Sequence, residues 1–241
     1  MLSFCDLDGT FVQTSRHIPE GVSTHIVYHS ATNKKLVMTD RQLALFNFLN
    51  ASTVVIPVTA RSLESLQRLK SHMPFQHYKV CEHGAYIYDK DDKLVDGYAD
   101  YMTELLAPVQ DQMYQAINCV DLFLRNSIFT GLRTRTVCLV DTVLIAEGSA
   151  VTEEHAKIIV SNVKNLNLPD IHVARNGKGF SITAFSDSYK QLACQYLVDN
   201  VPEYKQLPSM GFGDSISDLS FMTGCDFAVV PTQKSTQIRL I

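Results

Sequence analysis

The chain has 241 residues, of which 46% are hydrophobic and 19% are charged, and its formal net charge is −4. Lysine and arginine are scattered along the sequence rather than clustered, which argues against a nucleic-acid-binding protein. No apolar run approaches the roughly 18 residues that a membrane span requires. The first residues also lack the basic and apolar segments of a signal peptide, so we expect a cytoplasmic protein.

Six cysteines are widely spaced, and no two of them form a CxxC pair. In a chain without an export signal, this pattern favours reduced thiols over disulfides or a zinc site. Cys138 alternates with apolar neighbours in the segment TVCLV, which predicts that it is buried in a strand.

The first 83 residues alternate between predicted strands and helices. A short apolar strand in LSFCDLD ends at Gly9, and two apolar segments with a turn at residues 31–35 between them predict a small hairpin. Thr39 and Gln42 form a predicted capping box at the start of an amphipathic helix. The hairpin strands are expected at residues 24–28 and 36–38, further strands at 53–58 and 78–81, and a second helix from Ser62. Strand, helix and strand in this order predict an α/β doubly wound, Rossmann-like parallel sheet.

The pattern changes at about Gly84, where helix, strand and strand follow one another twice. A strand at residues 86–88 precedes this series, and Asn176-Gly177 predicts the turn of its last hairpin. The helices are expected at residues 102–117 and 152–166, and the strands at 134–140, 142–146, 171–174 and 180–184. This αββαββ pattern predicts a separate antiparallel α+β layer inserted into the parallel sheet.

The α/β pattern returns with a predicted helix from Asp187 and strands at residues 210–213 and 227–230. We therefore expect a core domain of residues 1–83 and 186–241, and a cap domain of residues 84–185.

Two of the polar segments that follow predicted strands carry pairs of carboxylates. Asp6 and Asp8 lie in DLDGT, where Gly9 permits a turn and close approach of a ligand. Asp214 and Asp218 lie in GFGDSISD, at the start of a helix. Ligands bind at this edge of a parallel sheet, and hard carboxylate oxygens suit Mg²⁺. A surface turn in the first segment and helix caps in the second are the alternatives.

The other two segments offer groups that bind anions. Thr59, Arg61 and Ser62 come between a buried strand and a helix, where free N–H groups and hydroxyls form an anion site; Thr59 or Ser62 as a simple N-cap is the alternative. Lys190 lies in the first turn of a helix, where a lysine is unfavourable to the helix dipole unless an anion compensates it. A solvated surface lysine is the alternative reading.

Together, in this order, DxDGT, Thr59, Lys190 and GDSxSD resemble the four motifs of the haloacid dehalogenase superfamily. The insertion resembles the type 2 cap of Cof-type and sucrose-phosphate-phosphatase-like members. The resemblance implies a Mg²⁺-dependent phosphatase in which Asp6 is the nucleophile that becomes an aspartyl-phosphate and Asp8 is the general acid and base. It implies that Asp6, the main-chain carbonyl of Asp8, Asp214 and Asp218 hold Mg²⁺.

The same resemblance implies that Thr59 and Lys190 contact the transferred phosphoryl group, and that Gly9, Arg61 and Ser62 lie in the substrate site. His83 stands where many such members have asparagine; it either touches the substrate or has no role. A small phosphorylated metabolite, with a sugar phosphate favoured, is the expected substrate. Cap cations that could select it are Arg125, Arg133, Arg135, Arg175 and Lys178, although solvated surface charges are the simpler reading.

Two alternatives remain. A sugar phosphomutase would use the same Asp6 and Asp8 pair, and a non-catalytic binding module would keep the fold without turnover. Nothing in the sequence indicates an oligomeric state.

Overall fold

The structure is a computed structural model that describes residues 1–29, 35–69, 71–139, 141–185, 189–232 and 238. These residues form two compact units, one of residues 1–98 and 187–241 and one of residues 99–186. Residues 84–98, which the sequence placed in the cap domain, group with the first unit. The reason is local pairing: β7 (Tyr86–Tyr88) is antiparallel to β6 (Lys79–Cys81), and the Tyr98 hydroxyl donates a hydrogen bond to the Gly84 carbonyl at 2.6 Å.

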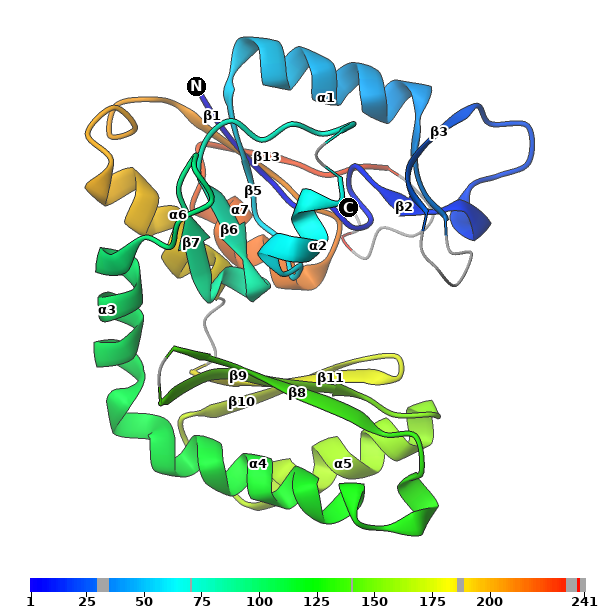
Figure 1. The fold of residues 1–241 in the computed structure, drawn as a ribbon, viewed down its shortest axis with the longest axis vertical. Coiled ribbons are helices and arrows are strands. Elements are labelled where there is room, and N and C mark those ends of the chain that lie inside the picture. The colour runs from blue at the N-terminus through cyan, green and yellow to red at the C-terminus, as the bar shows by residue number, and fades with distance from the viewer. Residues whose placement is uncertain (30–34, 70, 140, 186–188, 233–237, 239–241) are drawn as a thin grey trace. The chain divides into compact units, whose positions relative to one another are not determined.

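The first unit is built on a four-stranded parallel sheet, which confirms the predicted α/β fold class (Figure 1). Its strand order is β13-β12-β1-β5, and Phe4 of β1 lies between Ile56 of β5 and Gly211 of β12. The strands are β1 (Leu2–Cys5), β5 (Val54–Pro57), β12 (Ser209–Phe212) and β13 (Phe227–Val229). β1 and β5 are almost completely buried, as their continuous apolar sequences predict.

Helices cover both faces of this sheet. Figure 1 shows α1 (Asp40–Ser52) on one side and α6 (Tyr189–Asn200) with α7 (Leu219–Thr223) on the other. The predicted capping box of α1 is confirmed, because the Gln42 N–H donates to Thr39 Oγ1 at 3.3 Å and Gln42 Oε1 accepts from the Thr39 N–H at 2.9 Å. α6 contains Lys190 in its first turn, as predicted; residues 187 and 188, where the helix was expected to start, lie outside the described residues.

The predicted hairpin before α1 is confirmed as part of a small antiparallel sheet. β3 (Thr24–His29) pairs with β4 (Lys35–Thr39), which also pairs with β2 (Gln13–Thr14). The turn expected at residues 31–35 lies outside the described residues except for Lys35.

β6 was expected to be a third full strand of the parallel sheet, and here the structure differs. Among the described residues, a single parallel bridge, between Val58 and Val80, joins it to the chain after β5. Its ladder partner is the antiparallel strand β7. α2 (Leu63–Gln67), between β5 and β6, is only 5 residues long.

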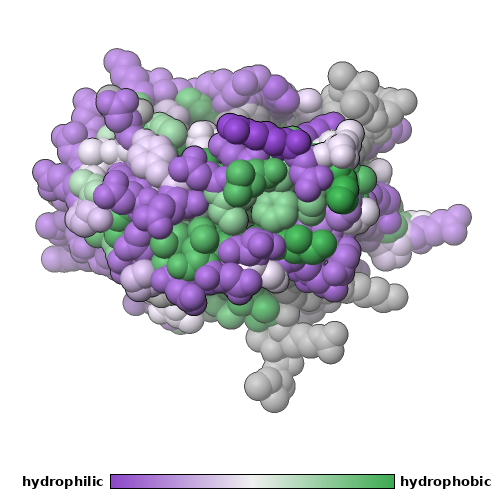
Figure 2. Space-filling model, turned by 90° about the horizontal axis from the view of Figure 1, so that it is seen from below, coloured by the Kyte–Doolittle hydropathy of each residue, from purple (hydrophilic) through white to green (hydrophobic). Residues whose placement is uncertain are grey.

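The second unit contains the antiparallel sheet that the αββαββ pattern predicted, with strand order β10-β11-β9-β8. The strands are β8 (Arg133–Leu139), β9 (Thr142–Ser149), β10 (Ile171–Asn176) and β11 (Gly179–Ala184). Thr152 caps α5 (Glu153–Asn165), and its side chain accepts a hydrogen bond from the His155 N–H at 3.1 Å. Figure 2 views the side of α4 (Gln110–Leu124) and α5 that faces away from the sheet of this unit, where apolar side chains lie among polar ones.

Two details of this unit correct the sequence interpretation. The single helix expected at residues 102–117 is two helices, α3 (Asp96–Leu106) and α4 (Gln110–Leu124). Pro108 lies in the short 3₁₀ turn between them, and proline both lacks an N–H donor and disfavours helical conformation in the residue before it. Cys138 is exposed rather than buried, because side chains alternate between the two faces of β8: Val137 and Leu139 point to the buried face, and Cys138 between them points to the other face.

No helix among the described residues is long and apolar enough to cross a membrane.

Candidate active site

Asp6 lies where β1 ends, at the carboxyl edge of the parallel sheet. Its N–H donates to the Phe212 carbonyl of β12 at 2.9 Å, which continues the parallel pairing of the two strands by one residue. The side chain is buried, with the residue 6% exposed. The strand thus ends by placing a carboxylate in the interior at the edge where α/β sheets bind ligands.

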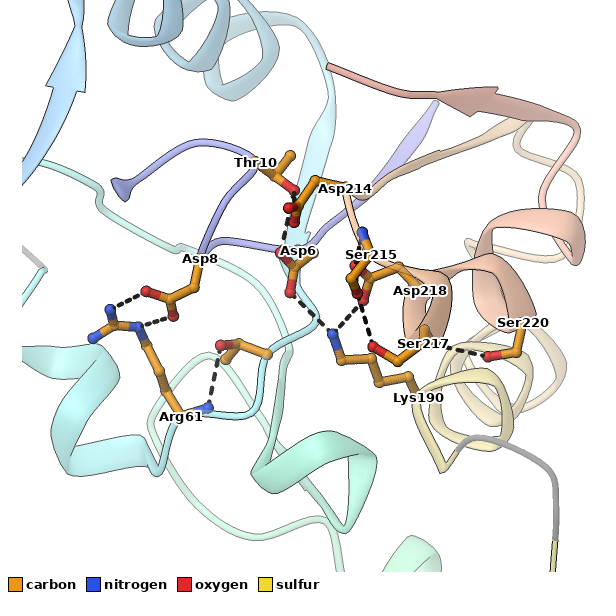
Figure 3. Close-up of polar contacts among 11 residues, drawn as sticks. Asp6, Asp8, Thr10, Arg61, Lys190, Asp214, Ser215, Ser217, Asp218 and Ser220 are labelled. Carbon is orange, nitrogen blue, oxygen red and sulfur yellow. Dashed lines mark hydrogen bonds and ion pairs between the residues drawn. The ribbon is translucent and has the colours of Figure 1, made fainter. Parts of the chain in front are cut away.

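Asp214 and Asp218 bring two more buried carboxylates to this point. Asp214 follows β12, and Asp218 lies in the short 3₁₀ turn Ile216–Asp218 before α7. One carboxylate oxygen from each of Asp6, Asp214 and Asp218 lies within 4.8 Å of the others (Figure 3). Strand ends that are adjacent in the sheet therefore unite residues more than 200 positions apart in the chain.

Lys190 supplies the positive charge of this cluster. Its Nζ donates to Asp6 Oδ1 at 2.9 Å and to Asp218 Oδ1 at 2.6 Å, and the residue is only 5% exposed (Figure 3). The solvated surface lysine considered as an alternative is thereby excluded. The N-terminus of α6 is an unfavourable place for a cation, and the two buried carboxylates compensate for that.

The electrostatics of the cluster reflect burial and an excess of negative charge. Burial raises the pKa of Asp6 to about 7; Lys190 opposes this rise, and Asp218 and Asp8 add to it. Burial likewise raises the pKa of Asp214 to about 6, with a further contribution from Asp218. Burial alone would lower the pKa of Lys190, but Asp6 and Asp218 hold it above the ordinary range. The lysine stays charged, and the carboxylates compete for one cation.

The residues of this cluster fit a divalent cation. Three buried carboxylates face one ammonium group, and hard oxygen donors of this kind are the ligands that Mg²⁺ takes. Gly9 allows the close approach, because its φ is +98° and a Cβ there would lie 2.4 Å from Asp214 Oδ2. Asp6, Asp214 and Asp218 are therefore the side chains that could hold Mg²⁺; the expected contribution of the Asp8 main-chain carbonyl stays a prediction.

Asp8 points away from the clustered carboxylates. Its Oδ2 accepts from Arg61 Nε at 2.6 Å and its Oδ1 from Arg61 Nη2 at 2.5 Å (Figure 3). The Asp8 side chain is 49% exposed, whereas that of Arg61 is 13% exposed. The sequence predicted a role for each of these residues but not their pairing.

The loop after β5 holds the remaining predicted residues. Thr59 is 1% exposed; its N–H donates to the Val80 carbonyl at 2.9 Å, and its Oγ1 accepts from the Arg61 N–H at 3.2 Å. Ser62 is the N-cap of α2, since its side chain accepts from the Ser65 N–H at 3.2 Å. Of the two N-cap candidates, Ser62 thus has that role, and a substrate contact by either residue stays a prediction.

Two residues support the cluster without having been singled out from the sequence. The Thr10 hydroxyl lies 3.2 Å from Asp6 Oδ2 and 3.3 Å from Asp214 Oδ1, so it can donate to either carboxylate. Ser215 donates to Asp218 Oδ2 from its N–H at 3.1 Å and from its Oγ at 2.5 Å. Thr10 is part of DLDGT, and Ser215 stands three residues before Asp218, which is the spacing of a capping box.

His83 lies in a turn with unusual backbone conformation. Glu82, His83 and Gly84 have φ values of +49°, +57° and +97°, respectively. The His83 N–H donates to the Thr59 carbonyl at 3.0 Å, which ties this turn to the loop after β5. Both interpretations of the His83 side chain, substrate contact or none, stay predictions.

Two of the cap cations, Arg135 and Arg175, contact residues of the second unit. Arg135 pairs with Glu147 across β8 and β9. Arg175 donates to the Gly177 carbonyl at 2.7 Å and lies 3.8 Å from Glu153. Arg125, Arg133 and Lys178 are exposed. Substrate selection by any of these five stays a prediction.

No protein-family model and no curated protein sequence matches the chain. Solved structures do match it in fold. The sucrose-phosphatase of Synechocystis sp. PCC6803, in complex with sucrose and phosphate, has 17% identity and a TM-score of 0.56 over 92% of this chain and 79% of its own. The C-terminal domain of trehalose-6-phosphate phosphatase from C. albicans has 12% identity and a TM-score of 0.58 over 92% and 72%.

A haloacid dehalogenase-like hydrolase from Bacteroides thetaiotaomicron has 13% identity and a TM-score of 0.54 over 95% of this chain and 93% of its own. A structure described as the subclass IIB sugar phosphatase BT4131 of the same superfamily is equally similar, with 13% identity and a TM-score of 0.53. The resemblance found in the sequence motifs is thus confirmed at the level of the fold: the chain has the fold of haloacid dehalogenase-type sugar phosphatases.

Proposed function

We propose that the chain is a Mg²⁺-dependent phosphatase that hydrolyses a small phosphorylated metabolite, with a sugar phosphate favoured, through an aspartyl-phosphate on Asp6. One observation carries the proposal. A buried carboxylate at the end of the first strand, Asp6, is paired with Lys190 and lies beside Asp214 and Asp218, whose oxygens suit a divalent cation.

In the first step, an oxygen of Asp6 attacks the phosphorus of the bound monoester. The bond from phosphorus to the leaving oxygen breaks, and Asp8 gives its proton to that oxygen. In the second step, Asp8 takes a proton from a water molecule whose oxygen attacks phosphorus. The bond from phosphorus to Asp6 then breaks, which releases inorganic phosphate and restores both aspartates.

Charge neutralisation is the main requirement, because Asp6 and the substrate phosphate are both anions. Lys190 keeps its charge between Asp6 and Asp218, so it offers a fixed cation to the transferred oxygens. Thr59, Gly9 and Ser62 are the further proposed contacts. A Mg²⁺ ion held by Asp6, Asp214 and Asp218 would supply additional positive charge against the phosphoryl oxygens.

The substrate class rests on two kinds of support. The chain shares its fold with structures that are described as sucrose-phosphatase, trehalose-6-phosphate phosphatase and sugar phosphatase. The second unit adds an antiparallel sheet with exposed arginines, which are groups that bind phosphate or carboxylate in a fixed geometry.

The test measures phosphate release from a panel of sugar phosphates, other phosphorylated metabolites and p-nitrophenyl phosphate, with Mg²⁺ and with EDTA. We expect release with Mg²⁺, loss in EDTA, and a fall of at least about a thousandfold in Asp6→Asn. Asp100→Asn, which makes the same change at an exposed position of α3, should stay within about twofold of the unmodified chain.

Equal release from Asp6→Asn and the unmodified chain would refute the proposal. Absence of release from every compound would favour one of the alternatives. Isomerisation of a sugar phosphate that needs a bisphosphate activator would then identify a phosphomutase, and substrate binding without any turnover would identify a binding module.

A further inference from the structure

Asp8 is paired with Arg61, and the proposed mechanism gives this ion pair no role. The three clustered carboxylates are buried, and each is hydrogen-bonded by at least one of Lys190, Thr10 and Ser215. Asp8 has a different environment: its side chain is about half exposed, and Arg61 holds both of its oxygens (Figure 3).

Arg61 is itself fixed on several sides. Its Nη1 donates to Ser65 Oγ at 3.2 Å, so each of its three side-chain nitrogens has an acceptor in the protein. Its main-chain N–H donates to Thr59 Oγ1 at 3.2 Å, and its carbonyl accepts from the Glu82 N–H at 2.9 Å. Both its backbone and its guanidinium group are therefore held in place.

A planar guanidinium fork that binds both oxygens of a carboxylate sets the position and also the plane of that carboxylate. A half-exposed aspartate on a loop would otherwise move among several rotamers. A general acid and base must lie within hydrogen-bond reach of the oxygen that it serves, and small displacements lower its efficiency steeply.

We propose that Arg61 is the positioning residue for Asp8, and that it acts through Asp8 rather than by binding the substrate phosphate. This reassigns Arg61 from the substrate contact that the sequence implied. The inference rests on the proposed function, because it assigns Arg61 a part in the proton transfer of the same site.

The test compares Arg61→Lys with the unmodified chain on two kinds of substrate. Lysine keeps the positive charge but loses the fork. p-Nitrophenolate is a weak base that leaves without a proton, whereas an alkoxide needs one. For the alkyl phosphate of the panel with the highest turnover, we expect kcat/KM to fall at least about tenfold further than for p-nitrophenyl phosphate. The inhibition constant of inorganic phosphate should stay within about threefold, since Arg61 would not bind phosphate.

The outcomes separate the possible roles of Arg61. A rise of at least about tenfold in the phosphate inhibition constant would show a substrate contact and overturn the inference. So would an equal loss of kcat/KM on both substrates, which a merely structural role predicts. Arg68→Lys is the matched control, because Arg68 directly follows helix α2 and pairs with the exposed Glu64; it should change neither quantity.

A double-mutant cycle gives a second measurement that does not depend on the leaving group. If Arg61 acts through Asp8, Arg61→Lys should have little further effect on kcat/KM in an Asp8→Asn background, whereas independent roles would give additive losses. If the unmodified chain releases phosphate but the losses from Arg61→Lys and Asp8→Asn are additive, the inference is overturned and the proposed function stands. Absence of release by the unmodified chain would overturn the proposed function, and the inference with it.

Discussion

Lys190 Nζ donates to Asp6 Oδ1 at 2.9 Å, although the two residues are 184 positions apart in the chain. The lysine enters from the first turn of α6 and the aspartate from the end of β1. Both residues are almost completely buried, so neither can exchange this partner for water without rearrangement. A buried ion pair of this kind is strongly destabilised when one partner is removed.

Lys190→Met should therefore affect both activity and stability. We expect hydrolysis to fall at least about a hundredfold, because a fixed cation facing the transferred group is lost. The free energy of unfolding should fall by about 3–5 kcal/mol at pH 8, where buried carboxylates are left unpaired. The loss should be smaller at pH 5, where those carboxylates can take up protons. Denaturant titrations at the two pH values measure both effects.

Lys205→Met provides the matched control, since Lys205 is exposed and the same change there leaves no buried charge. Equal stability losses for the two variants would contradict the assignment of Lys190 as the cation of the cluster.

The sequence predicted the main residues of this cluster because strand ends can be recognised locally. Asp6 and Asp214 each follow an apolar strand, and parallel strands expose their carboxyl ends at one edge. Lys190 could be placed in the first turn of a helix from helical periodicity alone. These residues meet because the sheet order makes β1 and β12 neighbours.

Other features depend on side-chain direction or irregular backbone, which have no local signature. Arg61 stands 53 positions after Asp8, and only the path of the loop after β5 aims it at that carboxylate. Regular alternation along β8 buries Val137 and Leu139 and turns Cys138 outward, but the apolar residues on both sides of Cys138 gave no signal of which face is buried. Pro108, in contrast, was a visible signal for a helix break, and helical periodicity was given too much weight there.

The stability of the metal-free protein should depend on pH in a defined direction. The native pKa values of Asp6 and Asp214, about 7 and about 6, lie above the ordinary value of 3.8, so the native state binds protons more strongly than the unfolded chain. The contribution of these groups to the free energy of unfolding should thus fall as pH rises from about 4 to about 7. Saturating Mg²⁺ should reduce this fall, because the ion binds the ionised carboxylates.

Urea titrations of the unmodified chain and of Asp6→Asn, in EDTA and in Mg²⁺, measure this dependence. In EDTA at pH 8, Asp6→Asn should be the more stable of the two by up to about 4 kcal/mol, because the cost of burying an ionised Asp6 is removed while Lys190 keeps Asp218 as its partner. The difference should disappear near pH 4. A pH dependence that neither Mg²⁺ nor Asp6→Asn alters would show that other groups dominate it.

Thiol reactivity should distinguish Cys138 from the other cysteines. Cys138 is exposed, whereas burial raises the pKa of Cys81 to about 12 and holds the pKa values of Cys5 and Cys194 well above the ordinary value. Cys119 and Cys225 are half-buried, and burial raises their pKa values as well. Because the thiolate is the reactive form, we expect one fast equivalent with Ellman's reagent and slower reaction of the other five thiols. Cys138→Ser should abolish the fast phase; if that phase persists, the outward orientation of Cys138 is wrong.

Gly9→Ala should disturb the metal cluster through its neighbour. A Cβ at Gly9 would lie 2.4 Å from Asp214 Oδ2, so the aspartate would have to move, and the φ of +98° would itself be strained. We expect a loss of about 1–3 kcal/mol in the free energy of unfolding. The Mg²⁺ concentration that half-restores phosphate release after EDTA should rise at least about tenfold.

Gly21→Ala separates the effect of backbone strain from the effect of displacing Asp214. Gly21 has a φ of +83°, but nothing lies within 4 Å of a Cβ placed there. This variant should therefore show the backbone strain, about 1 kcal/mol, with an unchanged requirement for Mg²⁺. If both variants shift the Mg²⁺ requirement equally, the effect of Gly9→Ala does not arise from displacement of Asp214. If only Gly9→Ala shifts it, the close packing of Gly9 against Asp214 is what keeps that carboxylate in position for the cation.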